Sequence, residues 1–458
     1  MMREEAAGNL RRLLSKLPEW ADAAPSLQIP SRLNIEQCSS GVTARYKAAL
    51  ALRNLSPESI ADLTGGLGAD CLAFSKICRS VLYNEMNPEL ASAVEHNFEA
   101  LGVHNVVVRS CELRRGGVGE VLAGYRPDLI YLDPARRSDA GRKLFRLADC
   151  MPDVLPLKDE LLDACGDLLL KLSPMADISQ LRRELGPEVM EVHCVGAGGE
   201  CKELLLWLRR GWNGGMRIFV SGELNAASRE APAPGFGAAG EALASGFGAA
   251  GEAFAPGSGV SGESLATAQS SCAAGKAFEP VLSFTPQEEA EAPLKLFARL
   301  SDLREDMLLF EPSAAVSKSG CFKLLCSRFP LVKLGRSTHL YAAVREEVPE
   351  ELCRIGKLFR IIRIVEFSGA AAAALGREFP RCEVSARNLP LSSEALRQKM
   401  KCSSGGNVHI FAAGVDSAGV EGAPAEGWNG VTGVDFGGRE GAAGGSKRLL
   451  FVTEPLAK

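Results

Sequence analysis

The chain contains 458 residues, more than the about 250–300 that one hydrophobic core usually supports, so its length predicts two or three folded units. Hydrophobic residues make up 46% of the chain and charged residues 24%, as in ordinary globular proteins, which excludes a wholly disordered chain. The net charge of −4 excludes a generally basic nucleic-acid-binding protein, so any contact with nucleic acid must come from a local surface.

Neither a membrane span nor a metal site is expected. No apolar run approaches the about 18 residues that cross a bilayer, and the charged start of the chain differs from a signal peptide, so we expect a cytoplasmic protein without a membrane partner. The fourteen cysteines lie in apolar segments without a CxxC pair. Because Cys194 and Cys201 have only His193 nearby, they are one ligand short of a zinc tetrahedron. We therefore expect reduced thiols and no bound metal.

Residues 1–55 are expected to form a small helical cap. Apolar residues recur there at helical spacing, as Leu14 and Leu17 do, and Pro25 and Pro30 interrupt the pattern.

Residues 56–222 alternate between short apolar runs and helical patterns. The predicted strands are 59–64, 80–85, 105–109, 128–132, 167–172, 189–194 and 203–208, and the predicted helices are 70–78, 88–101, 155–165 and 177–185. Strands that alternate with helices form a parallel sheet covered on both faces, so we predict an α/β domain. The last two strands flank a glycine-rich turn and are expected to close the sheet as an antiparallel hairpin.

Two glycine- and alanine-rich segments interrupt the rest of the chain. Residues 223–277 contain an 11-residue repeat, with units that start at Gly235 and Gly246. Because this segment lacks the apolar surface that would offset the entropy of ordering, we expect a flexible insertion rather than a small solenoid. A second flexible insertion is expected at about 414–446, since a strand pattern resumes at 448–453. One or two further α+β units are expected over 278–344 and 345–458, with strands at 359–367 and 408–412 and helices at 368–379 and 393–400.

A glycine-rich turn follows the first predicted strand. Its candidate ligand-binding residues are Asp62, Thr64, Gly65, Gly66 and Gly68. Strand–glycine turn–helix units bring backbone N–H groups and a helix N-terminus to a ligand, which predicts a site for a nucleotide-type cofactor. A dinucleotide is disfavoured, because Cys71 stands where the third glycine of a GxGxxG motif would be.

Two acids after the next strands fit the same cofactor. Glu85 lies 19 positions after Gly66, where a carboxylate can accept hydrogen bonds from both hydroxyls of a ribose. Glu112 follows the third strand, where a side chain can approach the adenine. The alternatives are a purely structural turn with an ordinary surface glutamate at position 85, and a solvated side chain at position 112.

The fourth predicted strand ends in Asp133-Pro134-Ala135-Arg136-Arg137, at the sheet edge where ligands bind. The carboxylate of Asp133 and the carbonyl of Pro134 can accept the N–H hydrogens of an amine and aim the nitrogen lone pair at a methyl group. Arg136 can hold a phosphate or shape the pocket, or it pairs with a nearby carboxylate. Methylation at C5 of a pyrimidine would need a cysteine nucleophile here, so methylation of nitrogen is favoured.

Together these motifs resemble the class I methyltransferases, and more closely a bacterial group with a C-terminal THUMP-like domain. The residues that carry the resemblance are 36–40, 43–47, 62–70, Asn84, Glu85, 133–137, 171–174 and 310–315. The chain departs from the group in its long insertions and in Gly41, where an acid is usual.

The resemblance implies a seven-stranded Rossmann-like sheet that binds S-adenosylmethionine at Asp62, Gly65, Gly66 and Glu85. It also implies that residues 37–40 fold over the cofactor, so Gln37 and Ser39 join the candidate cofactor-binding residues. Asp133 is counted among them as well as among the catalytic residues. A ferredoxin-like domain is implied at 278–344 and a THUMP-like domain at 345–458. Because THUMP domains bind RNA, the resemblance suggests a tRNA or rRNA substrate.

A basic surface offers modest support for RNA as the partner. The candidate contacts are Lys323, Arg328, Lys333 and Arg336, accompanied by Lys318, Arg354, Lys357, Arg360 and Arg363. The alternatives are methylation of a protein or small-molecule amine, or an RNA-binding relic without activity. The retained Asp62, Glu85 and Asp133 argue against a relic. The sequence does not indicate an oligomeric state.

Overall fold

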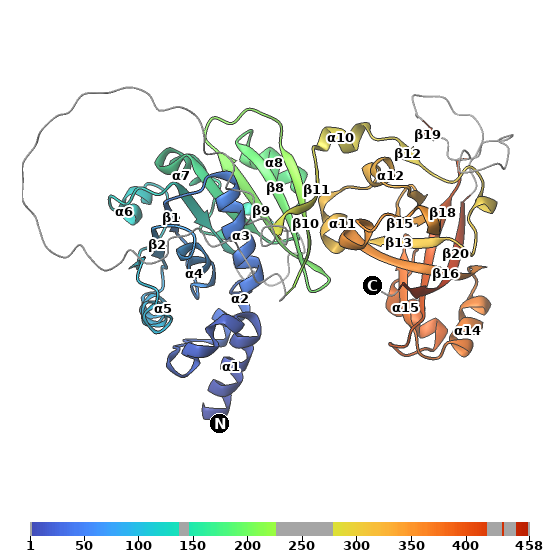
Figure 1. The fold of residues 1–458 in the computed structure, drawn as a ribbon, viewed down its shortest axis with the longest axis horizontal. Helices are drawn as coiled ribbons and strands as arrows, with labels where there is room; N and C mark the ends of the chain where they lie inside the picture. The colour runs from blue at the N-terminus through green and yellow to red at the C-terminus, as the bar shows by residue number, and fades with distance from the viewer. Residues whose placement is uncertain (1, 137–145, 226–277, 419–432, 435–445, 457–458) are drawn as a thin grey trace, which may run out of the picture. The chain divides into compact units, whose positions relative to one another are not determined.

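The computed structural model describes residues 2–136, 146–225, 278–418, 433–434 and 446–456 (Figure 1). Arg137 and most of the two predicted insertions lie outside these residues. The chain divides into two compact units. The first unit comprises Met1–Ser138, Leu147–Leu170 and Leu224–Glu279, and the second comprises Asp139–Arg146, Lys171–Glu223 and Pro280–Lys458. No helix of the described residues is long and apolar enough to cross a membrane.

Four helical segments form the N-terminal part of the first unit. They are α1 (Met2–Lys16), η1 (Pro18–Ser26), α2 (Arg32–Gln37) and α3 (Gly41–Asn54). Hydroxyl side chains begin the last two, because Ser31 and Ser40 each accept a hydrogen bond from the backbone N–H three residues later. Pro25 lies inside the 3-10 helix η1, and the break comes after it, at the extended segment that contains Pro30. The predicted helical cap is thus confirmed.

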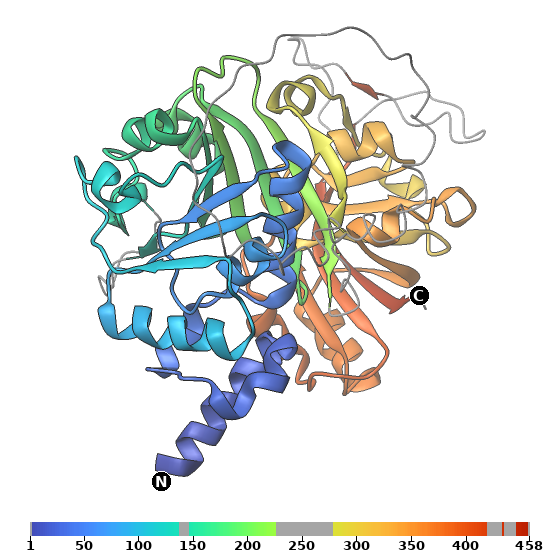
Figure 2. The ribbon, with the colours of Figure 1, turned by 60° about the vertical axis from the view of Figure 1, so that its left-hand side comes forward.

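Five parallel strands form one side of the first sheet and end at its edge. They are β1 (Ser59–Asp62), β2 (Ser80–Asn84), β3 (Val106–Arg109), β4 (Leu129–Leu132) and β7 (Asp167–Leu172), paired in the order β7-β4-β1-β2-β3. The intervening helices are α4 (Ala69–Ser75), α5 (Pro88–Ala100), α6 (Val118–Leu122) and α7 (Lys158–Cys165). Every residue of β4 is buried, as expected for a central parallel strand. Figure 2 shows the strands as neighbouring arrows coloured from blue to green.

An antiparallel hairpin continues this sheet after α8 (Ile178–Leu185). Strands β8 (Val189–Ala197) and β9 (Glu200–Arg209) are joined by Gly198 and Gly199, whose φ angles of 62° and 77° suit a tight hairpin turn. The predicted α/β class and its closing hairpin are confirmed.

The sheet contains nine strands, which corrects the predicted seven. The additional strands are β10 (Arg217–Leu224) and β11 (Pro280–Phe284), which pair with each other and extend the order to β11-β10-β8-β9-β7-β4-β1-β2-β3. They flank residues 226–277, so the low-complexity composition between them hid that the two runs belong together. Residues 280–284 thus add a strand to the first sheet.

A second sheet of seven strands lies in the second unit. Its strands are β13 (Leu308–Pro312), β14 (Val332–Gly335), β15 (Thr338–Ala343), β16 (Gly356–Glu366), β17 (Glu383–Arg387), β18 (His409–Asp416) and β20 (Ser446–Pro455), in the order β14-β15-β13-β16-β20-β18-β17. Its helices are α11 (Ala314–Ser319), α12 (Leu324–Arg328), α13 (Leu352–Ile355), α14 (Gly369–Glu378) and α15 (Ser393–Met400). Shorter elements of this unit include α10 (Pro286–Glu291), β12 (Leu294–Lys295) and β19 (Gly433–Val434).

The two faces of this sheet bury different apolar clusters. Along β18, Phe411 and Ala413 join one cluster and Ile410 and Ala412 join the other, as the two-residue period of a strand requires. The second cluster includes residues of α14 and α15, which therefore cover that face. The predicted strands at 359–367 and 408–412 and the predicted helices at 368–379 and 393–400 are confirmed, with ends that differ by a few residues.

Substitution of Gly376 tests how tightly α14 packs against α15. An ideal Cβ on Gly376 would lie 1.7 Å from the carbonyl oxygen of Met400, so Gly376→Ala forces the two segments apart. We expect a loss of about 2 kcal/mol in the free energy of unfolding, measured by urea denaturation. The control Gly369→Ala lies in the same helix with no atom within 4 Å, and should be neutral or stabilising by about 0.5 kcal/mol. Equal stability of the two variants would contradict the close packing.

Candidate active site

The glycine turn between β1 and α4 has a backbone that other residues would strain. Gly66 and Gly68 have φ angles of 53° and 83°, in the left-handed region that favours glycine. An ideal Cβ on Gly65 would lie 2.1 Å from the ring of Tyr83, whose hydroxyl donates a hydrogen bond to the carbonyl of Gly66 at 2.5 Å. The turn is therefore held against β2 by contacts that exclude side chains.

Asp62 lies at the end of β1 in an environment that disfavours its charge. Burial, followed by the nearby carboxylate of Asp70, raises the pKa of Asp62 well above its ordinary value, although the Thr64 N–H bond at 3.2 Å acts in the opposite direction. Asp133 and Glu85 raise the pKa further. The second oxygen, Oδ2, is buried and accepts no hydrogen bond from the described residues. A positively charged ligand group would compensate for both conditions.

Hydrogen bonds join the ends of β1, β2 and β3. The backbone N–H of Gly66 donates to the Glu85 carboxylate at 3.1 Å, and the N–H of Asn87 donates to its other oxygen at 2.9 Å. Asn84 is buried and bonds the carbonyl of Leu63 together with the backbone N–H and C=O of Cys111. Glu85 is thereby fixed beside the turn and is half-buried. Glu112, which follows β3, is exposed.

Asp133 is attached to the same turn. Its backbone N–H donates to the hydroxyl of Thr64 at 2.6 Å, and the N–H of Leu63 donates to the carbonyl of Tyr131 at 3.1 Å. Asp133 is half-buried and Pro134 is buried. Beyond them, β5 (Ala135–Arg136) pairs with β6 (Cys150–Met151). The backbone of Arg136 is placed by this pairing, and its side chain lies outside the described part of the structure.

A buried polar network links the N-terminal helices to the turn. The ammonium of Lys47, on α3, lies 3.1 Å from the Asp70 carboxylate on α4, and its side chain is completely buried. Ser39 and Tyr131 each donate to the other Asp70 oxygen at 2.8 Å. Lys47 also donates to Ser39 at 3.1 Å. Because these residues come from three separate segments, Asp70 fixes the helical cap and β4 relative to the turn.

This network clarifies the two candidate residues that precede α3. The hydroxyl of Ser39 is buried and bonded to Asp70, whereas Gln37 is exposed at the C-terminal end of α2. Lys47 and Asp70 belong to the motifs at 43–47 and 62–70, but the sequence did not indicate a role for either residue. A lysine inside an otherwise apolar run of α3 was the available signal.

The structure brings most of the predicted cofactor residues together in the first unit. Glu85 and Asp133 lie close enough to the buried carboxyl of Asp62 to contribute to its raised pKa, after burial and Asp70. S-adenosylmethionine carries an ammonium and a sulfonium group, and these positive charges suit a group of carboxylates in which Oδ2 of Asp62 has no hydrogen-bond donor among the described residues. The residues present therefore fit this cofactor.

Cysteines and other possible metal ligands occur throughout the described residues. All cysteines in the described residues are free thiols, and most of those inside strands are buried, such as Cys194. In the same residues no group of three His, Cys, Asp or Glu side chains is arranged to hold a metal ion.

The structure corrects one member of the predicted basic surface. Lys333 is buried, and its ammonium donates to the carbonyls of Gly335, Arg336 and Thr338 at 2.7–2.9 Å. Burial lowers the pKa of Lys333 to about 8. Every residue of β14 is buried, so the ammonium of Lys333 is not available to a phosphate.

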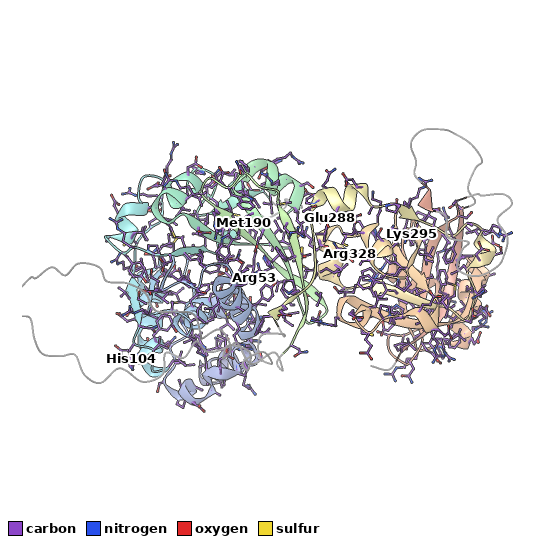
Figure 3. All side chains as sticks on the ribbon, turned by 45° about the horizontal axis from the view of Figure 1, so that its top comes forward. Arg53, His104, Met190, Glu288, Lys295 and Arg328 are labelled. Atoms are coloured by element: carbon purple, nitrogen blue, oxygen red, sulfur yellow. The ribbon has the colours of Figure 1, made fainter. Side chains whose placement is uncertain are left out.

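Several other members of that surface are engaged within the protein. Arg328 donates to the carbonyl of Ser283 at 2.8 Å and pairs with Glu288 at 3.4 Å. Figure 3 labels Arg328 and Glu288. Lys323 donates to the carbonyl of Ala290 at 2.7 Å. In β16, Arg360 pairs with Glu454 at 2.8 Å and Arg363 pairs with Glu378 at 2.7 Å, whereas Arg336 is exposed.

Comparisons with known proteins identify the domains and the fold. A ferredoxin-like domain family matches residues 308–348, and a THUMP domain-like family matches residues 356–421. The first match contains β13, β14 and β15, and the second contains β16, β17 and β18. Both matches therefore contribute strands to the same seven-stranded sheet.

Named relatives are methyltransferases. Two uncharacterized S-adenosylmethionine-dependent methyltransferases of Mycobacterium tuberculosis, from strains CDC 1551 / Oshkosh and ATCC 25618 / H37Rv, are each 28% identical over 209 residues, which are 45% of this chain and 51% of theirs. The chain thus spans about half the length of the curated relatives it matches. A crystal structure of a putative methyltransferase from Porphyromonas gingivalis W83 is 27% identical, with a TM-score of 0.69 over 98% of this chain and 88% of that one.

The chain therefore has the fold of the class I methyltransferases and is related to S-adenosylmethionine-dependent enzymes. Ferredoxin-like and THUMP-like domains follow the methyltransferase fold. The resemblance drawn from the motifs is confirmed.

Removal of the buried ammonium tests the Asp70 network. Lys47→Met leaves the Asp70 carboxylate buried without the ammonium that pairs with it, and we expect it to lower the free energy of unfolding by about 3 kcal/mol. The double variant Lys47→Met/Asp70→Leu removes both charges and should recover part of this loss. As a control, Arg32→Met breaks the exposed Arg32–Glu36 pair and should cost less than 1 kcal/mol. Equal losses for Lys47→Met and Arg32→Met would contradict a structural role for the network.

Substitution of Asp62 should affect stability and cofactor affinity in opposite directions. Because its pKa is raised in the folded protein, the ligand-free protein loses stability as the pH rises from the ordinary aspartate pKa toward the raised value. Asp62→Asn removes this charge, so its melting temperature at pH 7 should exceed that of the wild type. Its affinity for S-adenosylmethionine should fall about 10- to 100-fold, measured by calorimetric titration.

Asp128→Asn supplies the opposite control. The Asp128 carboxylate accepts hydrogen bonds from the backbone N–H groups of Glu58 and Ser59 at 2.9 Å, at the far end of the same strands. This variant should melt at a lower temperature and keep its cofactor affinity. A fall in the melting temperature of Asp62→Asn at pH 7 would show that the Asp62 charge stabilises the ligand-free fold.

Proposed function

We propose that this protein is an S-adenosylmethionine-dependent methyltransferase that methylates an exocyclic or ring nitrogen of a base in RNA. The observation that carries the proposal is the 2.6 Å bond between the Asp133 N–H and the Thr64 hydroxyl. It holds an acid-proline segment directly against the turn that fits the cofactor. A methyl donor and an acceptor nitrogen are then bound at one edge of the sheet.

Residues of the first unit hold the cofactor. Asp62 and the backbone of Gly65 and Gly66 lie at the turn, and Glu85 is positioned to accept the ribose hydroxyls, next to its bond with Gly66. When bound, S-adenosylmethionine supplies a methyl group on a positively charged sulfur. Tyr83 packs so closely against the turn that a side chain on Gly65 would clash with its ring.

Asp133 and Pro134 hold the acceptor. The Asp133 carboxylate and the Pro134 carbonyl accept hydrogen bonds from the N–H groups of the base, which directs the nitrogen lone pair toward the methyl group. Asp133 takes the proton that leaves the nitrogen after the C–N bond has formed. Cys150 lies on β6 and is buried, so it is not presented as the nucleophile that methylation of a pyrimidine C5 requires.

RNA is the proposed substrate because the chain carries a domain similar to THUMP at residues 356–421. A single-stranded or flipped base is required, since the acceptor nitrogen must reach the sheet edge beside Asp133. Methylation of a protein or small-molecule amine uses the same Asp133 chemistry but gives the THUMP-like domain no task.

Methyl transfer to RNA tests the proposal directly. Purified protein is incubated with S-adenosylmethionine labelled in its methyl group and with fractionated bacterial tRNA and rRNA that lack the modification, and digested nucleosides are analysed by mass spectrometry. We expect an N-methylated base. Asp133→Ala should lower kcat/KM by about 10²- to 10⁴-fold, because it removes the proton acceptor, and should leave the affinity for the cofactor nearly unchanged.

Asp159→Ala is the matched control, because the Asp159 side chain is exposed on α7 and pairs only with the adjacent Lys158 among the described residues. It should retain wild-type activity. A C5-methylated or ribose-methylated product would contradict the assigned acceptor. Binding of S-adenosylmethionine without transfer to any RNA fraction would reject RNA as the substrate.

A further inference from the structure

Four exposed cations at and just beyond the C-terminal ends of α14 and α15 have no acidic partner among the described residues. Arg377, Arg381, Lys399 and Lys401 form no ion pair with any described residue. This distinguishes them from Arg360, Arg363 and Lys447, which pair with Glu454, Glu378 and Glu366. None of the four belongs to the basic surface that the sequence suggested. We call these four residues the α14–α15 cluster.

Backbone packing brings the cluster together. Gly376 approaches the carbonyl of Met400 so closely that a Cβ would lie 1.7 Å from it. Arg377 follows Gly376, and Lys399 and Lys401 flank Met400. Farther along, the N–H of Cys382 donates to the carbonyl of Ser403 at 3.0 Å, and the N–H of Ser403 donates to the carbonyl of Pro380 at 2.9 Å. Segments 377–382 and 399–403 therefore run side by side. Figure 1 shows α14 and α15 as neighbours.

A further contact places Arg381 at the same surface. An ideal Cβ on Gly405 would lie 2.7 Å from its Nε atom, so the guanidinium lies over the loop that follows α15. Gly405 and Gly406 have φ angles of 110° and 84°, which allow the loop to pass beneath this side chain. The loop that follows Lys399 and Lys401 therefore lies against Arg381.

The acids near the cluster are already neutralised. Glu378 pairs with Arg363 at 2.7 Å, and Glu383 pairs with Arg397 at 3.3 Å while it accepts bonds from the Ser404 hydroxyl and the Gly405 N–H. The acidic neighbours therefore leave the four charges uncompensated.

Attraction to helix C-termini explains only part of this charge. Arg377 lies in the last turn of α14 and Lys399 in the last turn of α15, where the helix dipole favours cations. Each helix end carries about −0.5 charge, so two adjacent ends offset about one of the four positive charges. A net positive surface remains, and Arg381 lies outside both helices.

We propose that the α14–α15 cluster binds the phosphate backbone of the RNA substrate. This rests on the proposed function, since it specifies how the same RNA is held. Lysine and arginine side chains that release counterions from phosphates give sequence-independent affinity, which suits a domain that positions RNA while another part of the chain selects the base. The cluster lies wholly within the THUMP domain-like match at residues 356–421.

Salt-dependent binding tests the cluster. The probe is a fluorescein-labelled RNA hairpin with a single-stranded 3′ end, titrated with full-length protein at 50–200 mM salt. For Arg377→Gln/Arg381→Gln/Lys399→Gln/Lys401→Gln we expect the slope of log affinity against log salt to be smaller by about 3, because about 0.7 counterion is released for each phosphate contact in single strands. The wild type should then lose about fifty-fold more affinity than the variant over this range.

Matched double variants separate specific contacts from net charge. Arg377→Gln/Lys401→Gln should reduce the slope by about 1.4. Arg360→Gln/Lys447→Gln removes the same charge from two exposed but ion-paired side chains and should leave the slope unchanged. Calorimetric titration of S-adenosylmethionine into each variant should give wild-type affinity, and urea unfolding should give wild-type stability, so that a changed slope reports on RNA contacts and not on folding.

Each contrary outcome rejects a different statement. If the quadruple variant keeps the wild-type slope while the wild type methylates RNA, the cluster assignment is wrong and the proposed function stands. If the cluster controls RNA binding but no methyl group is transferred, the cluster stands and the proposed function fails. A wild type that does not bind the probe at 50 mM salt overturns the cluster assignment. Equal competition by polyglutamate, charge for charge, would identify an acidic polypeptide as the partner instead.

Discussion

The carboxylate of Asp70 connects the parts of the first unit on which the site depends. It receives the Lys47 ammonium at 3.1 Å and hydroxyl groups from Ser39 and Tyr131 at 2.8 Å. A buried carboxylate is costly unless its charge is paired and its oxygens accept hydrogen bonds. The segments that carry Lys47, Ser39 and Tyr131 must therefore all pack against Asp70. The glycine turn, the helical cap and the strand that carries Asp133 are thereby fixed in one arrangement.

The same turn concentrates negative charge that the ligand-free protein does not fully neutralise. Burial and nearby carboxylates raise the pKa of Asp62, and its Oδ2 has no hydrogen-bond donor among the described residues. A cationic ligand would stabilise such a site, because its positive charge would offset the repulsion between the Asp62 carboxylate and the nearby carboxylates. The strain of the apo site and the affinity for a sulfonium cofactor are two consequences of one charge arrangement.

The elements that the sequence predicted best are those with a strong local pattern. The alternation of 59–64 and 80–85 with the helical pattern of 88–101 identified the parallel sheet, and the glycines at 65, 66 and 68 identified its turn. Strands β10 and β11 were missed, because they pair with each other across residues 226–277 and neither shows a partner locally. The Lys47–Asp70 pair was missed for the same physical reason, since its two charges lie 23 positions apart and only the packing of α3 against α4 joins them.

Charge is predicted least well from sequence, because the fold decides which cations remain available. Lys333 was counted as a surface residue, yet the turn after β14 surrounds its ammonium with three carbonyls. Arg377 and Lys401 were overlooked, and they become neighbours through Gly376, an uncharged residue whose missing side chain lets two helix ends meet. A surface for phosphate is therefore defined by unpaired cations and by the backbone contacts that gather them, rather than by the number of basic residues in a segment.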